Sequence, residues 1–385
     1  MSFLNYLLFR IFTFPFGFLP YSILHKLGRV FGWIIFHGYA KYRKRALSNL
    51  ALATDLSLSS NEIKRLALQS IQSKAITALE YPRLYREKNI HSIVTCDNPE
   101  VADQIMQSGK SVIFFCGHQA NWELLFLEGT RRMQGVAIGR PIKNKHLYAW
   151  VIRMREKFGG KIVEPKNAYR EMMRALKQGK FVGIVGDQGM PDSGFSSPFL
   201  GRRAWTSPLP ALLSKRSGCP IIVATIRRVE GKYRIHYSQP IWPEIDNPME
   251  QVLAIFQESI KACPQEWLWT HNKWKQQLPG ILKKRLRHDA LAFIFKTDPT
   301  PYFNQIRNLY PGEHITAFVP QMIDAPLELK MEVKTHQELF NRDYRFKLVI
   351  DFTDNKKAQK HFSRLSALDV YSFKTPEEFL GHARR

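Results

Sequence analysis

A buried-strand pattern that leads straight into a helix limits most strongly how this chain can fold. Residues 111–115 form an apolar run typical of a buried strand, and residues 124–128 have the composition of a helix. The stretch between them, residues 116–123, reads Cys-Gly-His-Gln-Ala-Asn-Trp-Glu. Active sites of open α/β sheets gather at the carboxyl ends of strands, so we expect His118 to lie at such an edge.

His118 is followed five residues later by Glu123, in the next predicted element. A histidine paired with a carboxylate can act as a general base, because the carboxylate fixes the tautomer and stabilises the imidazolium. A zinc pair on one helix face needs a spacing of four, whereas His118 and Glu123 are five apart, so the motif is not a metal site of that kind. His118 and Glu123 converge only if His118 lies in the turn before the helix. On the motif alone, a helix-capping histidine beside a solvated glutamate fits about as well.

The chain alternates between predicted strands and helices, which is typical of the α/β class. Strands are predicted at 111–116, about 135–138, 161–163, 181–186, 220–226 and 233–238. Helices are predicted at 100–107, 121–132, 145–158, 167–178, 206–217 and 248–262, after an earlier helix that Ser59 and Glu62 begin in capping-box spacing. A turn at Glu230-Gly231 would make 220–238 a hairpin, so we expect a mixed sheet.

The His118-x4-Glu123 stretch resembles the H-x4-[D/E] motif of glycerolipid acyltransferases. It is most similar to the bacterial lipid A (lauroyl/myristoyl) acyltransferase family, whose version runs roughly H-x-G-N-W-E; here Ala120 stands at the family's glycine. Further blocks follow in family order: Arg140-Pro141, Arg153-x-Arg155 before Gly159-Gly160, Gly186-Asp187-Gln188-Gly189, Pro198-Phe199-Leu200-Gly201, Gly218-Cys219-Pro220, and a closing block from Pro264 to Lys275. The resemblance covers residues 1 to about 280.

The resemblance implies a mixed sheet flanked by helices and an acyl transfer from acyl-carrier protein to a hydroxyl of a lipid A precursor, with no cofactor and no metal. His118 would be the general base and Glu123 would hold and polarise it. Arg140, Arg153, Asp187 and Asn121 are the expected substrate-binding residues. Each has a plainer alternative: Arg140 and Arg153 can be ordinary surface bases, Asp187 a turn residue between glycines, and Asn121 a residue that only shapes the site.

The net charge of +24 points to an anionic partner. Residues 281–385 carry 18 Lys+Arg and 13 Asp+Glu, hence +5, so +19 lies in residues 1–280. An anionic membrane, a phosphorylated lipid or an acidic carrier protein explains this field as well as nucleic acid does. No nucleic-acid-binding motif is present, so we expect no nucleic-acid partner. The bases that follow the motif, namely Arg140, Lys143, Lys145, Arg153 and Arg155, are expected to rim the substrate groove.

The N-terminus is apolar and has no acidic residue before Asp55. Prolines and bases interrupt residues 3–38, which disfavours a clean transmembrane helix, and a basic cluster follows at 41–45. We expect a membrane anchor at the cytoplasmic face of the inner membrane rather than the alternative, a buried helical hairpin. The four cysteines form no C-x-x-C pair, which fits a reducing compartment.

Three domains are predicted: an anchor at 1–40, an acyltransferase domain at 41–280 and a small Rossmann-like α/β extension at 281–385. The extension is faintly similar to part of the amino-terminal half of a two-domain glycosyltransferase, but it has no nucleotide fingerprint, so a structural or docking appendage is favoured. The alternative functions are an acyltransferase for another glycolipid or lysophospholipid, a glycosyltransferase-linked bifunctional protein, and a non-catalytic basic protein that binds membrane or nucleic acid.

Overall fold

The computed structural model describes residues 2–277, 280 and 282–384, and the chain divides into two compact units. The first unit comprises residues 1–35, 68–188 and 206–268. The second comprises residues 36–67, 189–205 and 269–385. The domain boundaries expected from the sequence, at residues 40 and 280, remain predictions.

The first unit is built on a seven-stranded sheet with the order β1-β9-β8-β2-β5-β3-β4. Its strands are β1 (Val94–Cys96), β2 (Ile113–Cys116), β3 (Gly135–Ile138), β4 (Lys161–Val163), β5 (Phe181–Val185), β8 (Ile221–Val229) and β9 (Lys232–Tyr237). Only the β8–β9 pair is antiparallel, and its turn places Glu230 and Gly231 at φ of 49° and 80°. The predicted mixed α/β class is therefore confirmed, including the turn of the hairpin.

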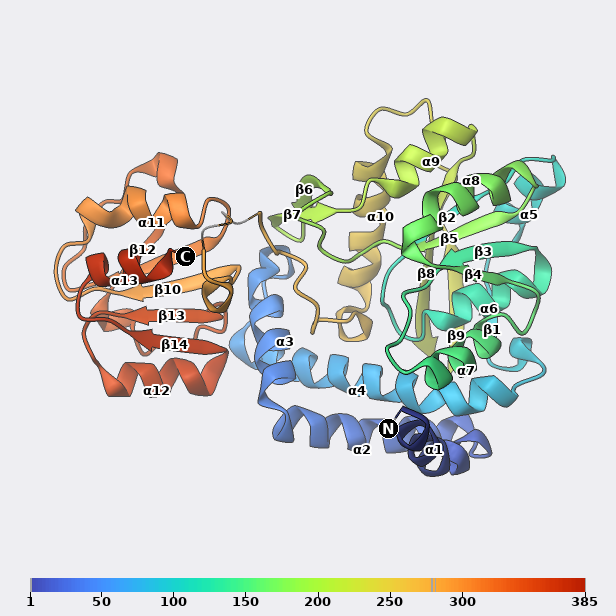
Figure 1. Cartoon of the computed structure of the whole chain (residues 1–385), viewed down its shortest axis with the longest axis horizontal. Helices are drawn as coiled ribbons and strands as arrows, with labels where there is room; N and C mark the ends of the chain where they lie inside the picture. Colours follow the sequence, from blue (N-terminus) through green and yellow to red (C-terminus); the bar gives the residue numbers. More distant parts are fainter. Residues whose placement is uncertain (1, 278–279, 281, 385) are drawn as a thin grey trace. The chain divides into compact units, whose positions relative to one another are not determined.

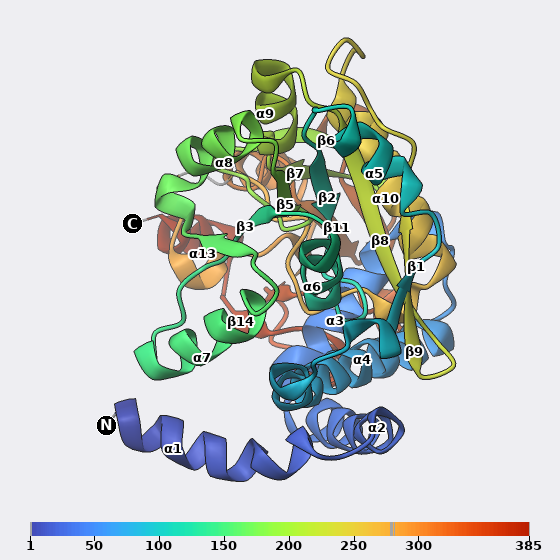
Figure 2. The same ribbon diagram turned by 90° about the vertical axis from the view of Figure 1, so that its right-hand side faces the viewer.

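Helices cover both faces of this sheet (Figures 1 and 2). They are α5 (Glu100–Gln107), α6 (Glu123–Arg132), α7 (Lys145–Arg155), α8 (Ala168–Lys177), α9 (Leu209–Ser217) and α10 (Pro248–Ala262). Successive side chains of a strand point to opposite faces. Phe114 of β2 joins the core cluster that contains Leu124 and Leu127 of α6, whereas Phe115 packs edge-on against Phe256 of α10. Thus α6 and α10 lie on opposite faces.

The N-terminal segment consists of α1 (Ser2–Thr13) and α2 (Tyr21–Gly38), and α2 lies against the long helix α4 (Ser60–Arg86). Gly28 and Gly32 permit this contact, because a Cβ on either would lie under 3 Å from the backbone of Ile76 or Gln72. No helix in the described residues is both long enough and apolar enough to cross a membrane.

Helix α1 lies beside α7, as Figure 2 shows. Arg10 stacks over the ring of Trp150 at 4.6 Å, and Phe9 contacts the same ring. Most of the other large apolar side chains of the N-terminal segment are exposed: Phe3, Leu4, Leu7, Leu8, Ile11, Phe12, Phe14, Phe18, Ile23, Val30, Trp33 and Ile34. The segment therefore packs through one side and leaves an apolar surface uncovered.

The second unit contains a parallel sheet of the order β12-β11-β10-β13-β14, which is a Rossmann-like arrangement. Its strands are β10 (Ala290–Ile294), β11 (His314–Val319), β12 (Glu332–Thr335), β13 (Leu348–Asp351) and β14 (Asp369–Ser372). Helices α11 (Phe303–Leu309) and α13 (Pro376–Ala383) pack on one face, and α12 (Lys356–Leu365) packs on the other (Figure 1). The hairpin β6 (Phe195–Phe199) and β7 (Arg202–Thr206) lies largely in this unit too.

Helix α3 (Ala40–Leu52) belongs to the second unit and is joined to its sheet by buried polar contacts. The ammonium group of Lys347 is fully buried, forms an ion pair with Asp289 at 2.7 Å and donates to Asn49 Oδ1 of α3 at 2.6 Å. Ser48 Oγ donates to the carbonyl of Arg345 at 2.6 Å. The C-terminal sheet is therefore packed together with residues 36–67.

Candidate active site

Two parallel neighbours in the first sheet, β2 and β5, bring His118 and Asp187 together. Cys116 and Val185 are register partners at the ends of these strands, and His118 and Asp187 each lie two residues further along. The two side chains therefore leave the same sheet edge side by side. His118 Nδ1 lies 2.7 Å from Asp187 Oδ1.

Asp187 is a buried carboxylate that accepts three hydrogen bonds. Its Oδ2 accepts from the backbone N–H of His118 and from the indole N–H of Trp267, each at 2.8 Å, and its Oδ1 faces His118 Nδ1. Burial alone would raise the pKa of Asp187, but the nearby His118 and these hydrogen bonds hold the pKa well below its ordinary value. Asp187 is therefore ionised, and an anionic acceptor at Nδ1 keeps the His118 proton on that nitrogen.

The other ring nitrogen of His118, Nε2, then carries the lone pair that a general base needs. The amide nitrogen of Gln188 lies 3.4 Å from it, and the Trp122 ring packs edge-on against the imidazole at 4.7 Å between centroids. The His118 side chain is 14% exposed, so a substrate can reach it. The preceding residue must be glycine, because a Cβ on Gly117 would collide with Phe256 and approach Asp187 Oδ2 to 2.9 Å.

We expected the carboxylate of Glu123 to hold the His118 ring, but the carboxylate at His118 Nδ1 belongs to Asp187. Glu123 is the first residue of α6, and its carboxylate accepts from Arg155 Nε at 2.7 Å, from Arg155 Nη2 at 2.5 Å and from Tyr81 Oη at 2.5 Å. Asp187 occupies Nδ1 because its strand is paired in register with that of His118, whereas Glu123 begins the helix and faces α7. Arg155, which we assigned to the groove rim, is thus tied to the motif glutamate.

The turn that carries His118 is fixed by backbone contacts. The His118 carbonyl accepts from Leu268 N at 3.1 Å, and Ala120 N donates to the Glu266 carbonyl at 2.9 Å. The Ala120 carbonyl accepts from Thr77 Oγ1 of α4 at 2.8 Å. Ala120 has a φ of 42°, in the left-handed region that glycine adopts most easily, which explains why a glycine suits this place in the motif.

Asn121 is fully buried, so it positions the turn and does not present its amide to solvent. Its Nδ2 donates to Glu80 Oε2 at 2.7 Å, and the same buried carboxylate contacts Tyr233 Oη at 2.8 Å and His25 Nε2 at 2.6 Å. The network joins α2, α4, β9 and the active-site turn. Nothing in the local sequence indicates these contacts, because Glu80 lies 41 residues before Asn121 and 153 before Tyr233.

Arg140 and Arg153, the two expected substrate-binding arginines, are both exposed. Arg140 follows β3, and Arg153 lies in the last turn of α7, on the helix that also carries Arg155. Lys143 and Lys145 are exposed in the same region of the chain. The contacts found for the described residues do not join any of these four bases to His118, so their roles remain predictions.

An apolar cavity, part of it open to solvent, adjoins the motif. Trp122, Glu123 and Arg155 form its polar side, and Trp122 also touches His118. Most of the remaining lining consists of apolar side chains and glycines, joined by Cys116 and Tyr237: Phe114, Leu125, Phe126, Gly129, Ala137, Ile138, Ile162, Phe181, Gly183, Val185 and Ala224. Its mostly apolar lining suits the hydrocarbon part of a ligand.

Among the described residues, no group of three or more His, Cys, Asp or Glu side chains is arranged to hold a metal ion. Cys116 lines the cavity, and burial raises the pKa of its thiol well above the ordinary value, so the thiolate needed for nucleophilic attack is disfavoured.

Comparison with known proteins finds similarity to acyltransferases. The chain is 26% identical over 152 residues to a lipid A biosynthesis palmitoleoyltransferase of Escherichia coli (strain K12), and equally to a lipid A biosynthesis acyltransferase of Shigella flexneri. The aligned residues make up 38% of this chain and about half (49%) of each relative. The family model of bacterial lipid A biosynthesis acyltransferases matches residues 2–276. The chain therefore belongs to the bacterial lipid A biosynthesis acyltransferase family.

Proposed function

We propose that this protein transfers a fatty acyl chain from acyl-acyl carrier protein to a hydroxyl of a lipid A precursor, with His118 as general base. The observation that carries this proposal is the hydrogen bond between His118 Nδ1 and the ionised Asp187, beside an apolar cavity. Family membership supports an acyltransferase of lipid A biosynthesis. The donor, the acceptor hydroxyl and the residue roles are our proposal.

His118 Nε2 removes the proton of the acceptor hydroxyl as the oxygen attacks the carbonyl carbon of the thioester. The new C–O bond gives a tetrahedral oxyanion, which collapses as the C–S bond breaks. The imidazolium then returns its proton to the departing thiolate, so the protein ends in its starting state. Asp187 holds the tautomer and stabilises the imidazolium. The Gln188 amide, 3.4 Å from Nε2, is a candidate hydrogen-bond donor to the oxyanion.

Glu123 has a positioning role in this proposal. Its bidentate contact with Arg155 ties the start of α6 to α7, and Trp122, one residue earlier, packs on His118. Breaking a buried ion pair leaves an uncompensated charge, which is strongly destabilising. Loss of Glu123 would therefore disturb the wall between His118 and the cavity.

The apolar cavity is our candidate for the acyl-chain site. A chain that entered past Trp122 would leave its thioester near His118 and place its methylenes among Phe114, Phe126 and Phe181. Each buried CH₂ contributes about 0.8 kcal/mol, so a long chain is a strong recognition element. The residues that line the cavity would set the preferred chain length.

The acceptor is an amphiphile, so we propose that the exposed apolar side chains of α1 and α2 rest on the cytoplasmic face of the inner membrane. Helix α1 packs on α7, and α7 carries Arg155, which reaches the cavity wall. An interfacial helix needs one apolar surface and no full span. The exposed bases Arg140, Lys143, Lys145 and Arg153 would attract the phosphates of the acceptor or the acidic carrier protein.

Mass spectrometry of lipid A tests the proposal in cells that lack their own copy of this enzyme. Cells that produce the active chain should contain lipid A that is heavier by one acyl group. Cells that produce His118→Ala at the same level should not. Identical lipid A from both, or an added group whose mass is not that of an acyl chain, would show that the proposed reaction is wrong.

A further inference from the structure

Helix α12 in the second unit presents one face made only of bases. Lys357, Lys360, His361 and Arg364 follow the spacing i, i+3, i+4 and i+7, which places them on the same side of a helix. The two lysines and Arg364 are exposed. A shallow hollow is lined by all four of these helix residues and by Arg342 and Phe340. We call these six residues the α12 basic surface.

The opposite side of α12 is buried, so the orientation of the helix is fixed. Ala358 and Phe362 are in the core on this face of the sheet, and the Phe362 ring contacts those of Phe318 and Phe346 at 5.8 and 5.7 Å between centroids. Rotation of the helix would expose this core. The bases are therefore held outwards by packing.

An ordinary solvated helix face mixes acids with bases, and this one does not. Helix α12 contains no acidic residue and places Lys356 and Lys357 in its first turn, where the helix dipole disfavours cations. Lys356 pairs with Asp354, but in the part of the chain that the structure describes Arg342, Lys357, Lys360 and Arg364 have no carboxylate partner. Such clustering of like charge costs stability, which indicates that it serves an anionic partner.

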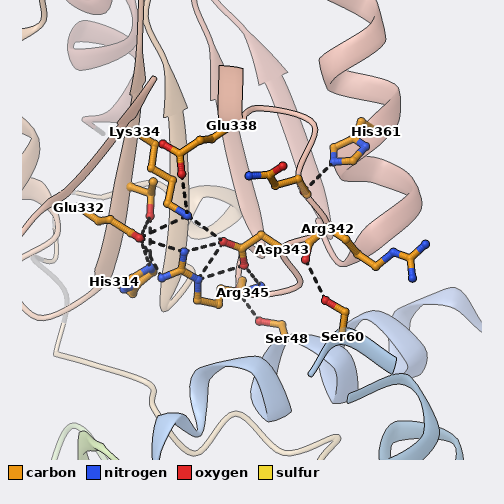
Figure 3. A network of polar contacts seen from close by, with 12 residues as sticks. Ser48, Ser60, His314, Glu332, Lys334, Glu338, Arg342, Asp343, Arg345 and His361 are labelled. Atoms are coloured by element: carbon orange, nitrogen blue, oxygen red, sulfur yellow. Dashed lines mark hydrogen bonds and ion pairs between the residues drawn. The ribbon is translucent and has the colours of Figure 1, made fainter. Parts of the chain in front are cut away.

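The loop that completes this surface is held in place beside the helix (Figure 3). His361 Nε2 lies 3.2 Å from the carbonyl of Asn341, and Ser60 Oγ of α4 donates to the carbonyl of Arg342 at 3.1 Å. Further along the loop, Arg345 forms ion pairs with Asp343 at 2.5 Å and Glu332 at 2.8 Å. Phe340, 51% exposed, therefore stands beside the bases on an anchored loop.

We propose that the α12 basic surface binds the phosphates of an anionic membrane, with Phe340 entering the interface between them. Bases near an anionic membrane surface attract it, and an aromatic side chain among them adds apolar burial in the headgroup region. The exposed phenylalanine favours a lipid surface over an acidic protein. This inference concerns the second unit and does not depend on the reaction proposed at His118.

The test is sedimentation of the purified full-length protein with phosphatidylcholine vesicles and with vesicles that also contain phosphatidylglycerol. The test variant is Lys357→Gln with Lys360→Gln. The matched control is Lys177→Gln with Lys215→Gln, two exposed lysines in the last turns of α8 and α9. We expect about a fivefold loss of partitioning for each base removed from the α12 basic surface, hence about 25-fold for the pair, on anionic vesicles only.

Equal losses in the two pairs would show general charge attraction and overturn the proposal, as would unchanged binding of the test variant. A second readout is binding of acidic acyl-carrier protein without vesicles. If the test variant loses carrier binding but keeps vesicle binding, the surface is a protein dock and the proposal is wrong. Loss of vesicle binding with unchanged acyl transfer to detergent-dispersed substrate supports it and leaves the proposed function intact.

Discussion

Replacing Asp187 by asparagine should stop catalysis while leaving the fold nearly unchanged. Oδ2 accepts two donors, the His118 backbone N–H and the Trp267 indole N–H, whereas Oδ1 faces only His118 Nδ1. The amide oxygen must therefore take the place of Oδ2, and the amide NH₂ must face Nδ1. The NH₂ donates, so Nδ1 must accept, and the ring proton moves to Nε2. Nε2 then has no lone pair to accept a proton, so His118 cannot act as the base.

The magnitudes follow from this geometry. A base trapped in the wrong tautomer costs about 10³–10⁴-fold in kcat, by comparison with other histidine–aspartate sites. No buried donor is left without an acceptor, so the free energy of unfolding should fall by only about 1–2 kcal/mol, the loss of one charge-assisted hydrogen bond. The assays are acyl transfer, urea unfolding and ¹⁵N NMR of the His118 ring, which reports the tautomer.

Glu123→Gln is the matched control. Glu123 accepts from Arg155 and Tyr81, so its loss should weaken the α6–α7 contact and lower stability by about 3 kcal/mol or more, without changing the His118 tautomer. If Glu123→Gln moves the ring proton and Asp187→Asn does not, the sequence-based pairing of His118 with Glu123 is right and our assignment is refuted.

Three further predictions concern the cavity, the turn and a buried acid. Gly183→Leu should shift acyl preference towards shorter chains, by about 0.8 kcal/mol per excluded CH₂, because Gly183 lines the cavity. The fold should accept the larger residue, since the atom nearest to an added Cβ is Ala137 Cβ at an ordinary 3.5 Å. Competition between donors of different chain length measures the shift. Ala120 has a φ of 42°, which a β-branched residue adopts only with strain. Ala120→Val should therefore lower the free energy of unfolding by about 2–3 kcal/mol, whereas Ala120→Gly should change it by no more than about 1 kcal/mol. Thermal unfolding of the two variants measures the difference. Burial raises the pKa of Glu313 to about 7 from 4.5, so its protonated form favours the folded state. The contribution of Glu313 to stability should be greatest below pH 4.5 and should be lost, by about 3 kcal/mol, as the pH rises from 4.5 through 7; the difference between wild type and Glu313→Gln in urea unfolding across this range measures it.

Most strands and helices of the first unit could be predicted because apolar runs there are bounded by turn residues. The predicted strands at 135–138 and 161–163 match β3 and β4, and the helices at 100–107 and 248–262 match α5 and α10. The short strand β1, Val-Thr-Cys, was not predicted, since its pairing with β9 joins residues more than a hundred positions apart in the sequence. The Phe195–Phe199 strand was not predicted either, since its Ser and Pro residues are uncommon in strands.

The site was predicted in part. From the sequence we expected His118 at a sheet edge and Asp187 in substrate binding, whereas the register of β2 with β5 makes the two residues partners. That register depends on which strands are neighbours in the sheet, and the spacing of apolar residues in the sequence does not show which strands are neighbours. The Glu123–Arg155 pair joins residues 32 apart on separate helices, and the Glu80 contacts span longer separations. Such pairs depend on tertiary packing, so single-sequence patterns do not indicate them.

The most direct test is a reconstituted reaction with acyl-carrier protein charged with a labelled acyl chain and a purified lipid A precursor, followed by mass spectrometry of the lipid. We predict that the wild-type protein adds one acyl chain to the precursor and that folded His118→Ala adds none above the uncatalysed rate. Transfer by His118→Ala at the wild-type rate, or no transfer by the wild-type protein to this acceptor, would contradict the account.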